Sequence, residues 1–478
     1  MEISRKLRIF SLVFSIFLLA VAANAQDGSE EEEKIPWQFS GVTGRAESSS
    51  YGYFQSFSDF PNYQERLDFE IEAGVTDYTY GAKLVPWIWA RVPEARAGAK
   101  QSARAYFDLK EGWVERTSPE WDIRVGNQII SWGAADQINP TDVWNSRDMY
   151  DPFASYKIPQ GTFQFKLHPA EVDWLNVEFL FSPFFRPNRL PLAFPDEGYA
   201  DISRGDSRTL VIMPNKVSTG LFVAPLQYRL VEPSYPQTWQ TGTRIQFLRF
   251  GGWDFSFTGF TGVEKNPRMA FSRKGNPADS ALPLVVTVYP SYHRMYLGGF
   301  DISGSITLDK QVFGLRFEGA YVIRDNSRAE NQPENFKQDL VKDDYVQMVL
   351  GVDHTVQKKV LDTVLYINSM FVYYQRTTNL ENPPGRLLVQ GLPSVDPWDR
   401  NFILYLEDRI TPALKATSTL LTSLRNLDGW WTPAIAYQLT DNLKASLGVD
   451  WFFTTNLNGF YGQFSDNRRA NLKVSFAF

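Results

Sequence analysis

The chain of 478 residues contains no cysteine, carries a formal net charge of −6, and is 15% aromatic. Without cysteine it can form no disulfide, no thiolate metal site and no cysteine nucleophile, and its acidic balance argues against a nucleic-acid partner. A mean hydropathy of −0.30 with so many aromatic residues is unusual for a soluble protein and typical of a transmembrane β-barrel, whose strands alternate lipid-facing and water-facing residues.

The first segment has the composition of a secretory signal peptide. The stretch 5–8 is basic, and the apolar run 9–21 that follows is shorter than a membrane-spanning helix. Ala23-Asn24-Ala25 fits the small-residue pattern of a cleavage site. The sequence therefore predicts cleavage near Ala25, followed by an acidic tail.

Apolar and polar residues alternate along much of the remaining chain. The stretch 67–75 places Leu67 and Phe69 on one face and the carboxylates of Asp68, Glu70 and Glu72 on the other. The same period recurs at 121–126, 253–258, 313–324, 443–450 and 471–478. A period of two with one apolar face predicts strands, and in a barrel the apolar face meets lipid while the polar face lines the lumen.

Short turns and longer polar loops separate these stretches alternately, a pattern typical of barrels with short turns on one side of the membrane. We predict an all-β, single antiparallel transmembrane barrel of about 18 strands, or 16 if the segments near 402–426 merge. The long loops are expected near 133–158, 183–236, 263–290, 326–341, 378–397 and 456–466. Girdle positions at strand ends are expected for Trp37, Trp87, Trp89, Trp113, Trp121, Trp174, Trp430 and Trp431, although aromatic side chains in the pore remain possible.

The polar faces of the predicted strands give a set of lumen-lining residues that is nearly balanced in charge, so no ion preference follows from it. The expected set is Asp68, Glu70, Glu72, Asp108, Lys110, Arg124, Gln128, Arg244, Asp254, Arg316, Glu318, Arg324, Asp353, Lys444 and Asp450.

The stretch "VGNQIISWGAADQINPTDVW", residues 125–144, begins as a strand and breaks into a polar turn. Asn139 and Pro140 are turn formers, and a short helix through Val143 and Arg147 is expected after them. We predict that loop 133–158 docks inside the barrel as a gate or anchor, with Trp132 at the outer rim. The residues expected to form this constriction are Trp132, Gly133, Asp136, Asn139, Pro140, Asp142 and Arg147.

Two other interpretations of this loop compete with the docked gate. A metal loop could use the oxygens of Asp136, Asn139, Asp142, Asp148 and Asp151, but their spacing is not that of a calcium loop. A catalytic loop would need a base, and no histidine is near.

The same stretch resembles one shared by poorly characterised, porin-like outer-membrane proteins of Gram-negative bacteria, which carry G-x-Q and then W-G-x-x-D-x-I-N-P-x-D. The resemblance covers about 25 residues and implies an outer-membrane channel-like barrel, with no substrate or catalytic residue attached. The matching positions are Gly126, Gln128, Trp132, Gly133, Asp136, Ile138, Asn139, Pro140 and Asp142.

The final stretch "NLKVSFAF" alternates up to a terminal aromatic residue. It resembles the closing strand of bacterial outer-membrane barrels, which typically ends in an aromatic residue read by the insertion machinery. Phe476 and Phe478 are therefore the expected membrane-insertion signal, and outer-membrane lipid and the barrel-assembly machinery are the expected partners. The expected organisation is a signal peptide (1–25), an acidic periplasmic tail (26–35) and a barrel (36–478).

These observations together favour a passive outer-membrane channel for small hydrophilic solutes, with no cofactor, no metal and no enzymatic activity. The histidines are only His168, His293 and His354, and neither a G-x-S-x-G nor an H-E-x-x-H motif occurs. An outer-membrane hydrolase using His293 remains an alternative. So does a plugged export or surface-binding barrel that uses loop 183–236, which carries eight prolines. The oligomeric state is open.

Overall fold

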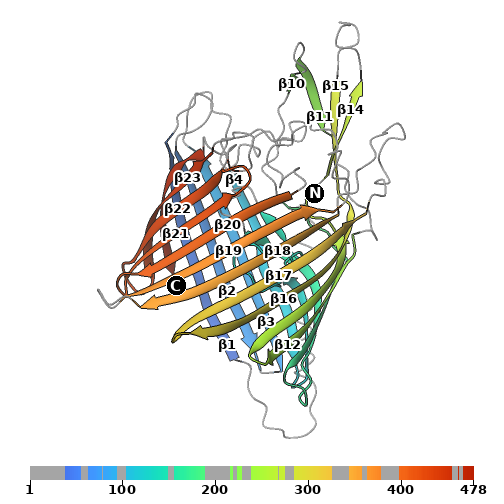
Figure 1. Cartoon of the computed structure of the whole chain (residues 1–478), viewed down its shortest axis with the longest axis vertical. Helices are drawn as coiled ribbons and strands as arrows, with labels where there is room; N and C mark the ends of the chain where they lie inside the picture. The colour runs from blue at the N-terminus through green and yellow to red at the C-terminus, as the bar shows by residue number, and fades with distance from the viewer. Residues whose placement is uncertain are drawn as a thin grey trace.

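The alternating stretches form the strands of one closed antiparallel barrel in the computed structural model (Figure 1). The model describes residues 38–54, 63–77, 79–93, 104–148, 156–188, 216–218, 223–228, 238–266, 268–274, 285–325, 344–357, 363–377, 398–454, 461 and 467–478. The expected signal peptide and acidic tail lie outside these residues, as does most of loop 183–236. Among the described residues, no helix is long and apolar enough to cross a membrane.

The barrel consists of eighteen strands. The first nine are β1 (Gln38–Tyr53), β2 (Tyr63–Thr76), β3 (Tyr80–Pro93), β4 (Arg104–Thr117), β5 (Trp121–Gln128), β8 (Gln160–Leu167), β9 (Leu175–Ser182), β12 (Gln240–Phe250) and β13 (Trp253–Val263). The others are β16 (Arg294–Leu308), β17 (Gln311–Arg324), β18 (Tyr345–Gln357), β19 (Val364–Arg376), β20 (Trp398–Arg409), β21 (Leu414–Ser423), β22 (Gly429–Gln438), β23 (Leu443–Phe453) and β24 (Arg469–Ala477).

Each of these strands pairs with the next one in this order, and the last pairs with the first. The closing pair β24–β1 runs from Arg45 opposite Ala477 to Tyr53 opposite Arg469. The expected count of 18 is confirmed, because the segments near 402–426 form two separate strands, β20 and β21, that pair from Asn401 to Arg409.

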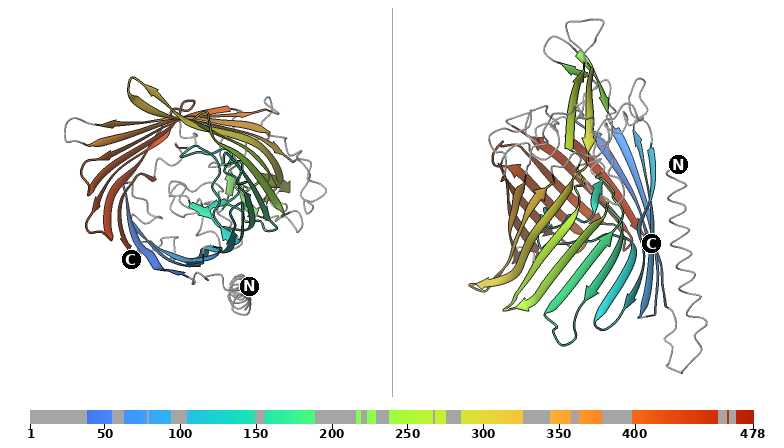
Figure 2. Two further views of the ribbon diagram at one scale, coloured as in Figure 1. Left: turned by 90° about the horizontal axis from the view of Figure 1, so that it is seen from below. Right: turned by 90° about the vertical axis from the view of Figure 1, so that its right-hand side faces the viewer.

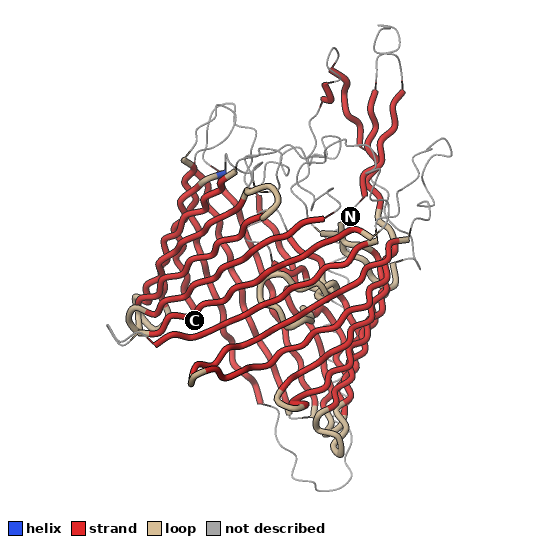
Figure 3. The backbone as a smooth tube through the Cα atoms, viewed as in Figure 1, coloured by secondary structure: helices blue, strands red, loops and turns tan. Residues whose placement is uncertain are grey.

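The strand ends that short connections join lie at one end of the barrel, the turn end, and the strand ends that longer connections join lie at the other, the loop end (Figures 1 and 3). The β16–β17 turn at Asp309 and Lys310, where both residues have positive φ, was not expected from the sequence. Beyond the loop end, β10 (Lys216–Ser218), β11 (Val223–Tyr228), β14 (Arg268–Lys274) and β15 (Val285–Ser291) form a small separate sheet.

The two faces of the barrel strands differ in the way that the alternation predicts. Leu67 and Phe69 are exposed on the outside of β2, whereas Asp68 between them points into the lumen toward Arg66. Four of the tryptophans that were predicted to form a girdle face the lumen instead: Trp87, Trp89, Trp113 and Trp430. Trp37 lies outside the described residues. Trp87 and Trp89 are buried because the lumen contains a loop against which an aromatic ring can pack.

Candidate constriction site

The described parts of the connection between β5 and β8, residues 129–148 and 156–159, fold into the barrel, and we call them the inner loop. Figure 2 shows its two short strands, β6 (Ser146–Asp148) and β7 (Tyr156–Ile158), inside the barrel outline and toward one side. They pair with each other from Ser146 opposite Ile158 to Asp148 opposite Tyr156. The inner loop therefore occupies part of the cross-section of the barrel.

The carboxylate of Glu318, on the inward face of β17, holds the inner loop to the wall. It accepts hydrogen bonds from the backbone N–H groups of Ala134 (3.0 Å), Ala135 (3.1 Å) and Thr141 (2.8 Å), and from the Thr141 hydroxyl (2.8 Å). Glu318 is fully buried. Buried N–H groups need partners, and an ionised acceptor makes the strongest ones. These four residues form the Glu318 anchor.

Position 133, beside the Glu318 anchor, requires a glycine for both its backbone conformation and the space available. Its φ is +94°, in the region that favours glycine, and a Cβ placed there would lie 2.5 Å from Glu318 Oε2. The glycine thus permits both the turn and the close approach of the loop backbone to the carboxylate.

A second contact lies further along the loop. Asp136 pairs with Arg316 of β17 and accepts a hydrogen bond from Asn368 Nδ2 of β19 (2.5 Å). Arg316 also pairs with Asp353 of β18 at 3.1 Å. Next to Asp136, the apolar side chain of Ala135 packs in a cluster with Val349, Met370, Val372 and Ile403. Charge and apolar packing together fix this part of the loop to β17–β20.

Two tryptophans hold the root of the loop, and both lie inside the barrel. Trp132 is 2% exposed and donates from Nε1 to Glu178 (2.6 Å), and Trp144 is 1% exposed and donates to Thr162 Oγ1 (2.9 Å). Both pack in a core cluster with Phe260. The predicted position of Trp132 at the outer rim is therefore wrong, because the loop carries this residue inward to an acceptor on β9.

Asp142 joins the two arms of the loop. Its carboxylate pairs with Lys157 (2.8 Å) and Arg147 (3.1 Å) and receives the N–H of Trp132 at 3.4 Å. The pKa of Lys157 is lowered by burial, which the Asp142 carboxylate opposes. Asp142 thus binds groups of its own loop rather than the wall. In the turn before it, Asn139 Nδ2 donates to the Trp132 carbonyl at 3.5 Å and Pro140 is buried.

The short helix expected through Val143 and Arg147 is absent from the described part of the loop, where residues 146–148 form β6. Asn145 explains the difference, because its side chain replaces helical hydrogen bonds. It accepts from Ile130 N (2.7 Å) and donates to the carbonyls of Gln128 and Ile158 (3.0 Å each). Arg147 N donates to Asn188 instead of to a helical carbonyl.

The described carboxylates considered for a metal loop already have protein partners. Asp142 binds two cations, and Asp148 accepts the hydroxyl of Tyr156 at 2.5 Å. Burial raises the pKa of Tyr156, and the nearby Asp148 carboxylate raises it further, so this phenol keeps its proton and donates it. Asp151 lies outside the described residues. Within those residues, no group of three or more His, Asp or Glu side chains is placed to hold a metal ion.

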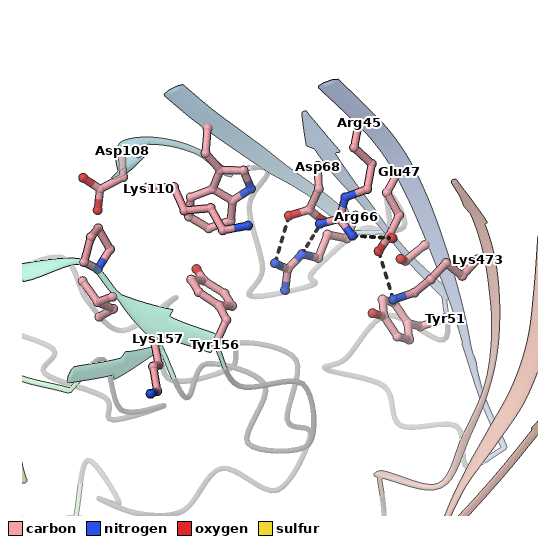
Figure 4. Close-up of a pocket in the computed structure, with 14 residues that line it drawn as sticks. Arg45, Glu47, Tyr51, Arg66, Asp68, Asp108, Lys110, Tyr156, Lys157 and Lys473 are labelled. Atoms are coloured by element: carbon pink, nitrogen blue, oxygen red, sulfur yellow. Dashed lines mark hydrogen bonds and ion pairs between the residues drawn. The ribbon is translucent and has the colours of Figure 1, made fainter. Parts of the chain in front are cut away.

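A cavity of about 200 Å³ remains between the inner loop and the opposite part of the wall (Figure 4). It is bounded by β1–β4, by β24 and by the loop segment 156–159. Its lining combines charged groups with aromatic rings. The lining residues are Arg45, Glu47, Ser49, Tyr51, Arg66, Asp68, Trp87, Asp108, Lys110, Tyr156, Lys157, Ile158, Pro159 and Lys473.

Most of the predicted lumen residues are placed in ion pairs or hydrogen bonds along the wall. Those near the cavity are Glu70 with Lys110 (2.6 Å), Asp108 with Arg186 (2.7 Å) and Glu72 with Lys83 (3.1 Å). Those elsewhere are Arg124 with Glu115, Gln128 with the Thr162 carbonyl, Arg244 with Asp301, Arg324 with Glu264, and Asp450 with Arg469. Asp254 and Lys444 instead lie exposed near the turn end, where Asp254 accepts from Arg249 N.

Several residues that shape the site were not expected from the sequence. Arg45, Glu47 and Lys473 lie on the alternating faces of strands at the two ends of the chain, and only barrel closure brings them together. The rings of Tyr156 and Trp87 contact edge to face, with 4.9 Å between their centroids. Tyr156 comes from the inner loop, and Trp87 was expected in the girdle. The alternation of polar and apolar residues could have placed Arg45, Glu47 and Lys473 on the inward face. No local pattern could have predicted the contact between Tyr156 and Trp87.

Lys265, just after β13, is a buried amine whose titration can be tested. Burial lowers its pKa to about 7, from an ordinary value of 10.5, and its Nζ donates to Gln240 Oε1. Between these two pH values the unfolded chain binds more protons than the folded one, so the free energy of unfolding rises with pH. We expect the melting temperature of the wild-type protein in detergent to rise between pH 7 and pH 10 more steeply than that of Lys265→Met. Lys444→Met, which removes an exposed amine, should keep the wild-type slope, and equal slopes for all three proteins would contradict the assignment.

No protein-family model and no curated protein matches the sequence. Among solved structures, the chain is similar to a BenF-like porin from Pseudomonas fluorescens at 9% identity, with 92% of this chain and 98% of that chain covered and a TM-score of 0.49. It is also similar to OccK5 (OpdH) of Pseudomonas aeruginosa (9% identity, 91% and 97% covered, TM-score 0.49) and to OccAB4 of Acinetobacter baumannii (8%, 92% and 97%, 0.48). Similarity at this level transfers no substrate and no residue role to the chain.

Proposed function

We propose that the protein is a passive channel of a bacterial outer membrane for small hydrophilic solutes, and that the inner loop forms its constriction. The observation that supports this proposal most directly is the position of the loop inside a closed barrel. The Glu318 anchor and the Asp136–Arg316 pair fix the loop to one side, while a cavity with a charged lining remains on the other side. Passive diffusion along such a path needs no cofactor and no energy source.

The outer surface supports a membrane location. Large apolar side chains are exposed on strands all around the barrel, among them Phe69, Phe257, Leu350 and Leu447. A closed barrel pairs its strand backbone groups internally and so can place such a surface in lipid. The terminal segment fits this location, since Phe476 and Phe478 point outward and are nearly half exposed. We propose them as the membrane-insertion signal.

The arrangement favours a channel over an enzyme. The three histidines lie far apart: His168 in the β8–β9 turn, His354 on β18 near the turn end, and His293 in the connection before β16 at the loop end. Asp136, Asp142 and Asn145 of the inner loop bind protein groups that hold the loop in place. A plugged export or surface-binding barrel would instead show no conductance, so conductance recordings distinguish these alternatives.

Neutralising the two loop carboxylates tests the role of the loop. In Asp136→Asn/Asp142→Asn, Arg316 keeps only Asp353 as an acidic partner and Lys157 loses Asp142, so we expect a looser loop, a higher single-channel conductance and a shifted reversal potential. Because charges exposed to electrolyte act over a Debye length of about 10 Å at 0.1 M salt, the selectivity change should shrink as salt rises. Planar-bilayer recordings at low and high salt measure both effects.

The negative outcomes of this experiment distinguish the channel proposal from the role of the inner loop. A folded wild-type barrel without conductance would refute the channel proposal. Conductance and reversal potential that are unmoved by the double substitution would remove the inner loop from the mechanism and leave the barrel as a channel. Asp254→Asn/Asp441→Asn is the matched control, because it removes two acids that lie at the turn end, away from the loop.

A further inference from the structure

The segment 183–188, which follows β9, contacts both arms of the inner loop, and we call it the clamp. On the first arm, the Ser146 hydroxyl donates to the Arg186 carbonyl. On the second arm, the Arg186 guanidinium donates to the Pro159 carbonyl at 2.7 Å, and it also pairs with Asp108 of β4 at 2.7 Å. The clamp therefore gives the inner loop a further attachment to the barrel wall.

Asn188 connects the clamp to the end of β13. Its side-chain oxygen accepts the N–H of Arg147 in the inner loop at 2.7 Å. Its own N–H donates to the Lys265 carbonyl at 3.0 Å, and its side-chain nitrogen donates to Asn266 Oδ1 at 2.8 Å. One residue of the clamp thus joins the inner loop to the backbone at Lys265.

The side chain of Lys265 is buried against the same segment. Its Nζ donates to Gln240 Oε1 of β12 and lies 5.4 Å from the ring centroid of Phe185. The Gln240 side-chain nitrogen donates in turn to the Phe184 carbonyl at 2.7 Å. A neutral amine therefore supports the clamp through Gln240, whereas an ammonium here would lose its hydration without gaining a carboxylate.

No carboxylate is paired with Lys265 within the part of the chain that the structure describes. Its neighbour Glu264 pairs with Arg324, and the Glu264 N–H donates to the His293 carbonyl at 2.8 Å. Burial consequently lowers the pKa of Lys265 to about 7. The charged or titratable side chains on the surrounding elements are Glu264, Arg324 of β17, Arg186 of the clamp and His293 before β16.

We propose that the clamp is a pH-sensitive lock on the inner loop, which neutral Lys265 holds closed and which a proton on Lys265 releases. This inference rests on the proposed channel function, in which the inner loop narrows the pore. When the clamp opens, water reaches Lys265 and its pKa returns toward the ordinary value of 10.5. Between pH 10.5 and pH 7, each lower pH unit therefore shifts the balance toward the open clamp by up to about tenfold. Below pH 7 the balance levels off, because both states then bind the proton.

A single thiol can report the position of the clamp, because the chain contains no cysteine. Ser146 is fully buried against the clamp, so a methanethiosulfonate reagent should reach the thiol of Ser146→Cys only when the clamp opens. The labelling rate in the detergent-solubilised full-length protein is taken at each pH relative to Ser146→Cys/Lys265→Met. We expect this ratio to fall by up to about tenfold per pH unit from pH 7 to pH 9. In Ser146→Cys/Lys265→Arg, whose guanidinium stays charged, labelling should remain fast throughout.

Single-channel conductance in planar bilayers should follow the same lock. We expect the wild type to conduct more at pH 7 than at pH 9, Lys265→Met to keep the lower conductance at both, and Lys265→Arg to keep the higher one. Gln240→Met removes the contact with the Phe184 carbonyl at every pH and should raise conductance at both, which tests the clamp even if a Lys265 variant does not fold. Lys444→Met removes an exposed amine at the turn end and should behave like the wild type.

The outcomes separate the lock from the channel. A conducting barrel whose labelling and conductance depend on pH equally in wild type and Lys265→Met would overturn the lock and leave the channel standing. Labelling that does not change between pH 7 and pH 9 in the Ser146→Cys protein would overturn the lock as well. A barrel that does not conduct, but whose labelling depends on Lys265 as expected, would overturn the channel and keep the clamp.

Discussion

Replacing Glu318 with alanine is expected to release the inner loop and to raise single-channel conductance at least about twofold. The substitution removes the acceptor of three backbone N–H groups and one hydroxyl. Each buried N–H left without a partner costs about 1–3 kcal/mol, so the docked position of the loop loses most of its advantage over an undocked one. Glu318→Gln keeps the shape and one acceptor oxygen but not the charge, and should give an intermediate conductance.

Two further variants make this expectation specific. Gly133→Ala should raise conductance in the same way, because its Cβ would collide with the Glu318 carboxylate. Since both changes act on one contact, the double variant should resemble the stronger single variant rather than their sum. Glu407→Ala removes a lumen acid of β20 that binds Tyr405 and Lys415, and should leave the loop docked. Equal conductance of wild type and Glu318→Ala would show that the Glu318 anchor does not hold the constriction.

Leu315→Arg is expected to prevent assembly of most of the protein, whereas Arg316→Leu should assemble. The two residues are neighbours on β17 and point to opposite sides, Leu315 with Phe317 out of the barrel and Arg316 into the lumen toward Asp136 and Asp353. An arginine facing lipid costs about 2–4 kcal/mol at the midplane and less toward the interfaces. Removing Arg316 costs less, because the lumen still admits water to the acids left behind.

Heat modifiability on a gel, in which folded barrels migrate differently from unfolded ones, measures this contrast. Arg316→Leu should also show altered conductance, because Asp136 loses its only cationic partner on the wall among the described residues and keeps Asn368. If both variants fold equally well, Leu315 does not face lipid and the inside–outside register of β17 is wrong.

Local alternation was sufficient to predict the barrel and the inward face of its strands. Leu67 and Asp68 lie on the expected sides because a strand has a strict period of two, and this period needs no knowledge of distant residues. The contacts of the inner loop could not be predicted in this way. Glu318 lies 177 to 184 positions from the residues whose N–H groups it accepts, so only the finished barrel shows that a lumen carboxylate serves as an anchor.

The tryptophans also show that local periodicity does not reveal the contacts made by the inner loop. A tryptophan near a strand end is a reasonable girdle candidate, and Trp431 is exposed as a girdle residue would be. Trp87, Trp89 and Trp132 became inward packing residues because a loop entered the lumen, which single-strand periodicity does not reveal. The surplus of bases over acids in the cavity lining was not apparent from the sequence either, because a charge count over the whole lumen combines groups that lie far apart.

The pairing of β24 with β1 has a consequence for the order of events in folding. Until β24 has formed, β1 keeps an unpaired edge, and the barrel cannot close. The Glu318 anchor joins segments separated by β8, β9, β12, β13 and β16, so the loop cannot reach its position before much of the wall has been built around it. Formation of such distant contacts is slow. We therefore expect a late kinetic phase in refolding in which the cylinder is already closed, the tryptophans at the loop root are still exposed to quencher, and the pore is wider than in the mature protein.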